Sequence, residues 1–171
     1  LGIVWREYRK FDENIWNLVL DRVREVRTKL APSVEHREAG DIGHAWNLCD
    51  LVAKKIEMRF ALLKAYEAGD RAELMRIRNC MVPEVIAAFE AVDATFRRQW
   101  MRTAKPFGLE VIQARNAVQA ARLEETALRI REYLDGTVAS IEELDARLSP
   151  AEKTTNALYT YNRVATGSTG L

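Results

Sequence analysis

The sequence has little of what catalytic and metal sites are usually built from. Its 171 residues include two histidines, two cysteines, eight glycines and four prolines. It contains no Glu-x-x-His pair, so the motif that supplies the ligands of a di-iron helical bundle is missing. It also contains no Gly-x-Ser-x-Gly motif and no glycine-rich phosphate loop. We therefore expect no metal site, no cofactor and no catalysis by this chain.

The few histidines and cysteines have structural interpretations. His36 and His44 are expected on surface loops. Asp41 lies three residues before His44, but two ligands do not make a metal site. Cys49 and Cys80 lie inside helical patterns and are interpreted as buried free thiols, because free cysteine behaves as a small core hydrophobe. A disulfide between them stays open.

The sequence also lacks an excess of one charge and a long apolar run. Its 26 basic and 25 acidic residues leave a net charge of +1, which gives no whole-molecule reason to bind nucleic acid or an anionic membrane. No apolar run approaches the ~20 residues of a membrane span, and the start of the chain lacks a secretory signal pattern. The chain does not begin with Met, so we expect a fragment or a processed piece. No compartment is assigned, with the cytoplasm favoured, and a homo-oligomer stays open.

What remains is a strongly helical pattern. Hydrophobic residues make up 48% and charged residues 30% of the chain, a profile typical of an ordered, helix-rich domain. Periodicity and capping residues predict helices at 12–32, 41–69, 70–104, 109–136 and about 140–148. We therefore predict an all-α domain over 1–150, a bundle of four main antiparallel helices plus a short fifth. Residues 151–171 are predicted to be an irregular or extended tail.

Individual residues indicate where these helices begin, end and bend, and which of their faces is buried. Pro32 is expected to end the first helix and Asp41 to cap the second, while Gly69 and Asp70 form a tight connection to the third. Pro83 lies inside the third, where the apolar stripe keeps its phase, so we expect a kink rather than a break. The predicted core stripes are Ile15, Val19, Val23, Val26 and Leu30 in the first helix and Leu48, Val52, Ile56 and Leu63 in the second.

The most distinctive stretch is 96–122, where a helix rich in arginine and aromatic residues breaks at Lys-Pro-Phe-Gly. Basic residues surround Trp100 here: Arg97, Arg98, Arg102 and Lys105. One interpretation is a nucleic-acid patch in which Trp100 stacks on a base. The other is a helix C-terminus with favourable basic charge and an aromatic packing anchor. The near-zero net charge favours the second.

The order of motifs in this stretch carries a resemblance to a known family. The order is Trp100 at a helix end, Lys105-Pro106-Phe107-Gly108-Leu109-Glu110, Arg115, and Tyr133-Leu134-Asp135-Gly136. This succession resembles the C-terminal helical region of bacterial β-N-acetylhexosaminidases of glycoside hydrolase family 20, over about residues 45–166. One departure follows Arg115, where the resemblance leads us to expect a small, glycine-rich stretch and the chain has Asn116-Ala117-Val118-Gln119.

The resemblance implies a helical accessory domain without its catalytic barrel. In that family a (β/α)8 barrel with an Asp-Glu pair cleaves terminal N-acetylhexosamine, and the acetamido group of the substrate is the nucleophile. A barrel needs ~200 or more residues of alternating strands and helices, a pattern that this chain lacks, so the barrel is expected upstream in the full-length protein. The implied role is to pack on and stabilise the barrel of the same polypeptide, with no nucleic-acid or membrane partner.

The residues implied in that role are structural rather than catalytic. The candidates are Trp100, Lys105, Phe107, Gly108 and Arg115. Phe107 is expected to insert as an apolar anchor where the third and fourth helices join, and Gly108 to permit the backbone geometry of the turn. The competing hypothesis is a free-standing helical module that binds a partner protein through an apolar face or through the patch around Trp100.

Overall fold

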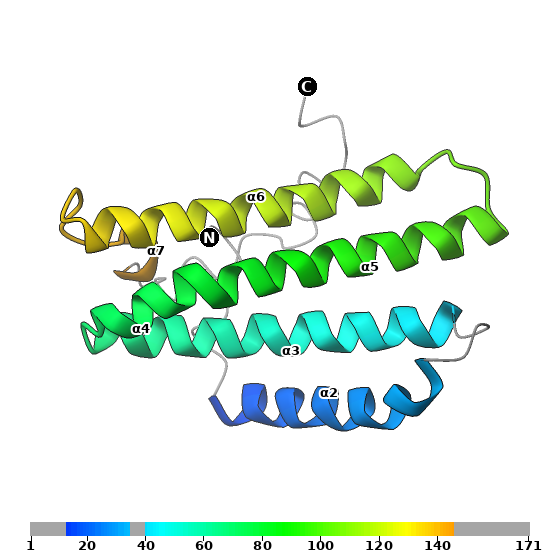
Figure 1. Ribbon diagram of the computed structural model, residues 1–171, viewed down its shortest axis with the longest axis horizontal. Helices are drawn as coiled ribbons and strands as arrows, with labels where there is room; N and C mark the ends of the chain where they lie inside the picture. The colour runs from blue at the N-terminus through cyan, green and yellow to red at the C-terminus, as the bar shows by residue number, and fades with distance from the viewer. Residues whose placement is uncertain (1–12, 35–39, 146–171) are drawn as a thin grey trace, which may run out of the picture.

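The computed structural model describes residues 13–34 and 40–145 (Figure 1). The elements are α2 (Glu13–Val34), α3 (Gly40–Glu67), α4 (Arg71–Arg76), the π-helical turn η1 (Ile77–Met81), α5 (Val82–Thr103), α6 (Leu109–Leu134) and α7 (Glu142–Asp145). Figure 1 shows α2, α3, α5 and α6 side by side, with successive long helices antiparallel. The predicted all-α class with four main helices and a short fifth is confirmed, and the described residues contain no strand. Asp12, His36 and the predicted tail 151–171 lie outside the described residues.

The core has two parts. The larger part joins α3, α4, η1, α5, α6 and α7, and its most deeply buried members are Met58, Leu62, Leu74, Ile77, Val82, Val85, Ile130, Ile141 and Leu144. The smaller part attaches α2 to α3 through Leu20, Ala53 and Ile56, with Trp16, Val19, Val23 and Phe60 packed around them. The helix α2 is thus held on the outer side of α3, whereas α3, α5 and α6 enclose the main core.

Because α3 lies between α2 and α5, it buries residues on two faces. The prediction of a single buried stripe is partly wrong, since Leu48 is 40% exposed and Val52 is also exposed, although Ile56 is buried. The spacing rule assumes one apolar face, and a helix that packs on two neighbours breaks that assumption. The apolar residues that α3 buries are Leu51, Ala53, Ile56, Met58, Leu62 and Ala65. In α2, likewise, Leu20 is buried and the predicted Ile15 and Val26 are exposed.

Two predicted helix boundaries are wrong. Pro32 lies inside α2, which continues to Val34. A proline in the last turn removes a single hydrogen bond, and the carbonyl released there can face solvent. Asp41 lies within the first turn of α3, which begins at Gly40. Its carboxylate accepts hydrogen bonds from Gln99 and Arg102 of α5 instead of capping the helix from outside.

The connection from α3 to α4 is the one that the sequence predicts. Gly69 has the left-handed φ of +64°, and the N–H of Asp70 donates to the carbonyl of Ala65 at 2.8 Å. Asp70 then caps α4, because its Oδ1 accepts a hydrogen bond from the N–H of Glu73 at 3.0 Å. Only the three residues 68–70 separate the two helices, and this tight turn sets α3 and α4 antiparallel.

Pro83 is accommodated without a break in the helical run. The π turn η1 precedes it, with the N–H of Val82 reaching the carbonyl of Ile77. Pro83 directly follows this π turn, so its missing N–H falls where the regular i→i−4 hydrogen bonding is already interrupted. The prediction of one continuous run is confirmed, and its irregularity is a π turn that the apolar spacing did not indicate. Cys80 in this turn is exposed and Cys49 is half-buried; both are free thiols, so their predicted burial is wrong.

None of the described helices is both long and apolar enough to cross a membrane.

Candidate interface site at the elbow between α5 and α6

The helices α5 and α6 are joined by the elbow, residues 104–108. The N–H of Ala104 donates to the carbonyl of Trp100 at 2.8 Å and ends α5. The indole Nε1 of Trp100 donates across the turn to the carbonyl of Lys105 at 2.7 Å. The ring of Trp100 packs at 5.7 Å from that of Phe96, one turn earlier in α5. The tryptophan therefore folds the elbow back onto the helix that it leaves.

Gly108 provides the backbone conformation from which α6 begins. Its φ of +94° and ψ of −16° are left-handed, and its N–H donates to Oε2 of Glu110 at 2.8 Å. A carboxylate in the first turn of a helix also interacts favourably with the helix dipole. Leu109 follows and is buried. Gly108 and Glu110 thus fix where the new helix starts and how it is oriented.

Replacing Gly108 by alanine is expected to lower the free energy of unfolding by about 1–2 kcal/mol, because L-residues pay this cost in a left-handed conformation. Space is not limiting, since an added Cβ would lie 3.6 Å from Cζ2 of Trp100, an ordinary contact. Gly43→Ala is the matched control, because it lies inside α3 with nothing within 4 Å of its Cβ position. It is expected to stabilise the chain by about 0.4–1 kcal/mol. Urea unfolding measures the change in the free energy of unfolding for both variants. If Gly108→Ala stabilises the chain as Gly43→Ala does, the interpretation of a left-handed turn at Gly108 is contradicted.

The structure brings together three of the five predicted candidate residues and places the other two elsewhere. Trp100, Lys105 and Gly108 meet at the elbow. Phe107 is 81% exposed, so the expectation that it inserts between the two helices is wrong: Trp100 fills the inner side of the turn and Leu109 takes the buried position. Arg115 lies further along α6 and is exposed.

A contact that the sequence prediction missed pins α6 to α5 beyond the elbow. The amide nitrogen of Asn116 donates to Oδ1 of Asp93 at 2.9 Å. In the sequence Asn116 is the single polar member of the apolar stripe of this helix, and it begins the departure from the glycine-rich stretch expected after Arg115. In place of a close backbone approach, the chain has a side-chain hydrogen bond between the helices. No pattern within either helix alone could have paired these two residues.

The elbow end of α5 is also tied to the start of α3. Oδ1 of Asp41 accepts hydrogen bonds from Arg102 at 2.6 Å and from Gln99 at 2.8 Å. The hydrogen bond from Arg102 is the main reason that the pKa of the Asp41 carboxyl lies below its usual range, and the bond from Gln99 adds to it. Arg102 is thus committed within the domain, which weakens the nucleic-acid interpretation. Trp100 is half-buried and its ring packs on Phe96 and lies beside Gly108, which also makes it poorly placed to stack on a base.

His44 lies beside this contact between α3 and α5. The prediction that it lies on a surface loop is wrong. It lies in α3, with Nδ1 at 2.9 Å from Oγ1 of Thr95 and its ring 5.8 Å from that of Phe96. The single hydroxyl proton of Thr95 can be donated to the carbonyl of Ala91 or of Val92, which lie at 3.0 and 2.9 Å. In that arrangement Nδ1 of His44 carries a proton and donates it to Oγ1. Burial lowers the pKa of His44, and the carboxylate of Asp41 opposes this shift more weakly.

We expect stability to fall as His44 is protonated. Its folded-state pKa lies below the ordinary value of 6.5, so the unfolded chain binds the proton more tightly. The free energy of unfolding is therefore highest above 6.5 and decreases as the pH falls through that value toward the lower folded-state pKa. Urea unfolding at about pH 8 and about pH 5 measures the decrease. His44→Asn keeps a donor toward Thr95 without titrating, and an unchanged slope in this variant would contradict the assignment.

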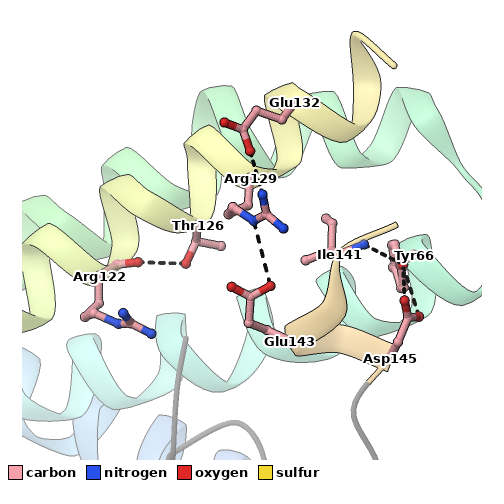
Figure 2. Close-up of polar contacts among 8 residues, drawn as sticks. All are labelled: Tyr66, Arg122, Thr126, Arg129, Glu132, Ile141, Glu143 and Asp145. Carbon is pink, nitrogen blue, oxygen red and sulfur yellow. Dashed lines mark hydrogen bonds and ion pairs between the residues drawn. The ribbon is translucent and has the colours of Figure 1, made fainter. Parts of the chain in front are cut away.

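The opposite end of the bundle carries a second polar cluster (Figure 2). The hydroxyl of Tyr66 accepts the N–H of Ile141 at 2.9 Å and donates to the carboxylate of Asp145, 3.1 Å from both oxygens. Arg129 of α6 pairs with Glu132 at 2.8 Å and with Glu143 of α7 at 3.8 Å. Burial raises the pKa of the Tyr66 hydroxyl, which keeps it protonated as a donor.

This second cluster is structural. Its carboxylates face a single guanidinium or a phenol instead of lying opposite each other across a cleft. The contacts join the end of α3 and the end of α6 to the short helix α7. Among the described residues no group of three or more His, Cys, Asp or Glu side chains is placed to hold a metal ion.

These observations define an all-helical domain whose polar contacts serve to join its helices. The family described as the Glycoside Hydrolase 20C C-terminal domain matches residues 10–160, and the chain belongs to this family. It is therefore an accessory domain of family 20 glycoside hydrolases, and the family resemblance seen in the sequence is confirmed. None of the curated proteins compared with the chain matches it.

Proposed function

We propose that this domain packs on the catalytic barrel of a β-N-acetylhexosaminidase-like enzyme in the same polypeptide and stabilises it. The observation that carries the proposal is the family match over 10–160, because a C-terminal domain of a glycoside hydrolase is made together with its catalytic domain. The parent activity would be hydrolysis of terminal N-acetylhexosamine residues.

The side-chain contacts of the described residues favour a stabilising role over a catalytic one. The carboxylates of Asp41, Glu132, Glu143 and Asp145 are engaged by cations or hydroxyls of this domain. Glycoside cleavage instead needs two carboxyl groups facing each other across the scissile bond. The domain also exposes large apolar side chains, Phe107 above all, and exposed apolar surface of this kind commonly marks a protein interface.

Comparing the catalytic domain with and without this chain tests the proposal. Joined to the chain, the catalytic domain is expected to keep activity at a higher temperature, since contacts made only by the folded state raise its stability. The 171-residue chain alone is expected to leave aryl N-acetylglucosaminides uncleaved. Equal thermal inactivation with and without the chain would overturn the stabilising role. Turnover by the chain alone would overturn the non-catalytic one.

A further inference from the structure

We propose that the elbow together with the last three residues of α5 is the surface through which this domain docks on the catalytic domain. We call this surface, residues 101–108, the elbow tip. We further infer that the docking site opposite it is an apolar socket with carboxylates at its rim. The inference rests on the function proposed above and names the contact that would carry it. Figure 1 shows that the loop joining α5 to α6 projects from one end of the bundle, where a second domain can reach it.

The side chains of the elbow tip are exposed, and yet its backbone is held in one conformation. Every side chain from Met101 to Phe107 is exposed. The backbone beneath them is fixed by the bond from Trp100 to the carbonyl of Lys105, by that from Leu109 to the carbonyl of Pro106 at 3.2 Å, and by the left-handed Gly108. Preorganised groups bind more tightly because little conformational entropy is lost on association.

What the elbow tip presents is an aromatic anchor. Phe107 is 81% exposed, and Met101 is exposed in the last turn of α5. Exposed single apolar residues are ordinary, but here Phe107 follows a proline and precedes a left-handed glycine, so its position is set on both sides. Buried aromatic side chains at the centre of an interface contribute much of its binding energy.

The charge around the anchor indicates the partner. The sixteen residues 94–109 contain four basic residues and no acidic one. Arg102 is paired with Asp41, whereas Arg97, Arg98 and Lys105 pair with no carboxylate of the described residues. A surface that receives this tip is favoured when carboxylates surround the apolar socket. A second copy of the chain meeting it elbow to elbow would bring the same positive charge and be disfavoured.

Hydrogen exchange compares the 171-residue chain with the polypeptide that carries both this chain and the catalytic domain. Amides of 101–109 are expected to exchange about tenfold or more slowly in the longer polypeptide, as docking restricts local opening. Phe107→Ala should remove most of this protection while leaving the unfolding temperature of the 171-residue chain unchanged. Met75→Ala, a 51% exposed residue of α4, is the matched control and should affect neither. Lys105→Glu should weaken docking, and less so at high salt.

The outcomes separate this inference from the function on which it rests. Protection that appears elsewhere in the domain but not at 101–109 would overturn the elbow as the docking surface and leave the packing role intact. Protection nowhere would overturn both. Protection at 101–109 that rises with the concentration of the 171-residue chain alone would assign the surface to a second copy and overturn the catalytic domain as occupant.

Discussion

Replacing Leu62 by alanine is expected to lower the free energy of unfolding by about 2–5 kcal/mol, the range for removing a buried leucine side chain and leaving a cavity. Leu62 is 0% exposed and packs in the main core that joins α3, α5, α6 and α7. In a domain of this size each kcal/mol corresponds to about 2–4 °C in the unfolding temperature. Urea and thermal unfolding of the purified chain measure the loss.

Leu48→Ala is the matched control, because it makes the same change in the same helix. Leu48 is 40% exposed, so its replacement is expected to cost about 1 kcal/mol or less. The periodicity of the sequence does not separate the two positions, since it places Leu48 in the core stripe and has Leu62 widening the same stripe. Equal losses in the two variants would show that α3 is rotated from the orientation described here.

That contrast shows which part of the fold the sequence can predict. Turns are local: Gly69 and Gly136 act through their left-handed backbone and Asp70 through a side-chain cap three residues away, and each lies where its residue type predicts. The orientation of α3 is not local, because it depends on having neighbours on two sides. The two faces interleave along the helix, so no single period describes them.

The sequence predicts where the elbow lies but not the direction in which its side chains point. The Trp100, Lys105 and Gly108 positions form a turn that the Lys-Pro-Phe-Gly break indicates. Whether Phe107 points into the bundle or away from it depends on which residue fills the inner side, and the indole of Trp100 already does so. The Asn116–Asp93 and His44–Thr95 contacts were missed for a related reason, since each joins residues of different helices whose relative register is set by the packed core.

The second large effect is expected at the short helix α7, where Leu144→Ala should cost about 2–5 kcal/mol. A helix of four residues has no stability of its own in water, so α7 depends on its contacts with the bundle. Leu144 and Ile141 are both 1% exposed and belong to the main core, which means that α7 closes the end of that core. If α7 unfolds together with the bundle, urea unfolding reports the whole loss in one transition.

Tyr66→Phe separates the polar contribution of the same contact from its apolar one. The variant keeps the ring, which packs edge-on against Tyr133 at 5.4 Å, but leaves the N–H of Ile141 without its acceptor. An unsatisfied buried donor costs about 1–3 kcal/mol, so the loss should be smaller than for Leu144→Ala. Thr137→Ala, an exposed residue of the loop before α7, should change stability by about 0.5 kcal/mol or less. Hydrogen exchange of the 144 and 145 amides checks this result. If these amides exchange fast in Leu144→Ala, Tyr66→Phe and Thr137→Ala while the stability of the bundle is unchanged, α7 opens independently and is not part of the core.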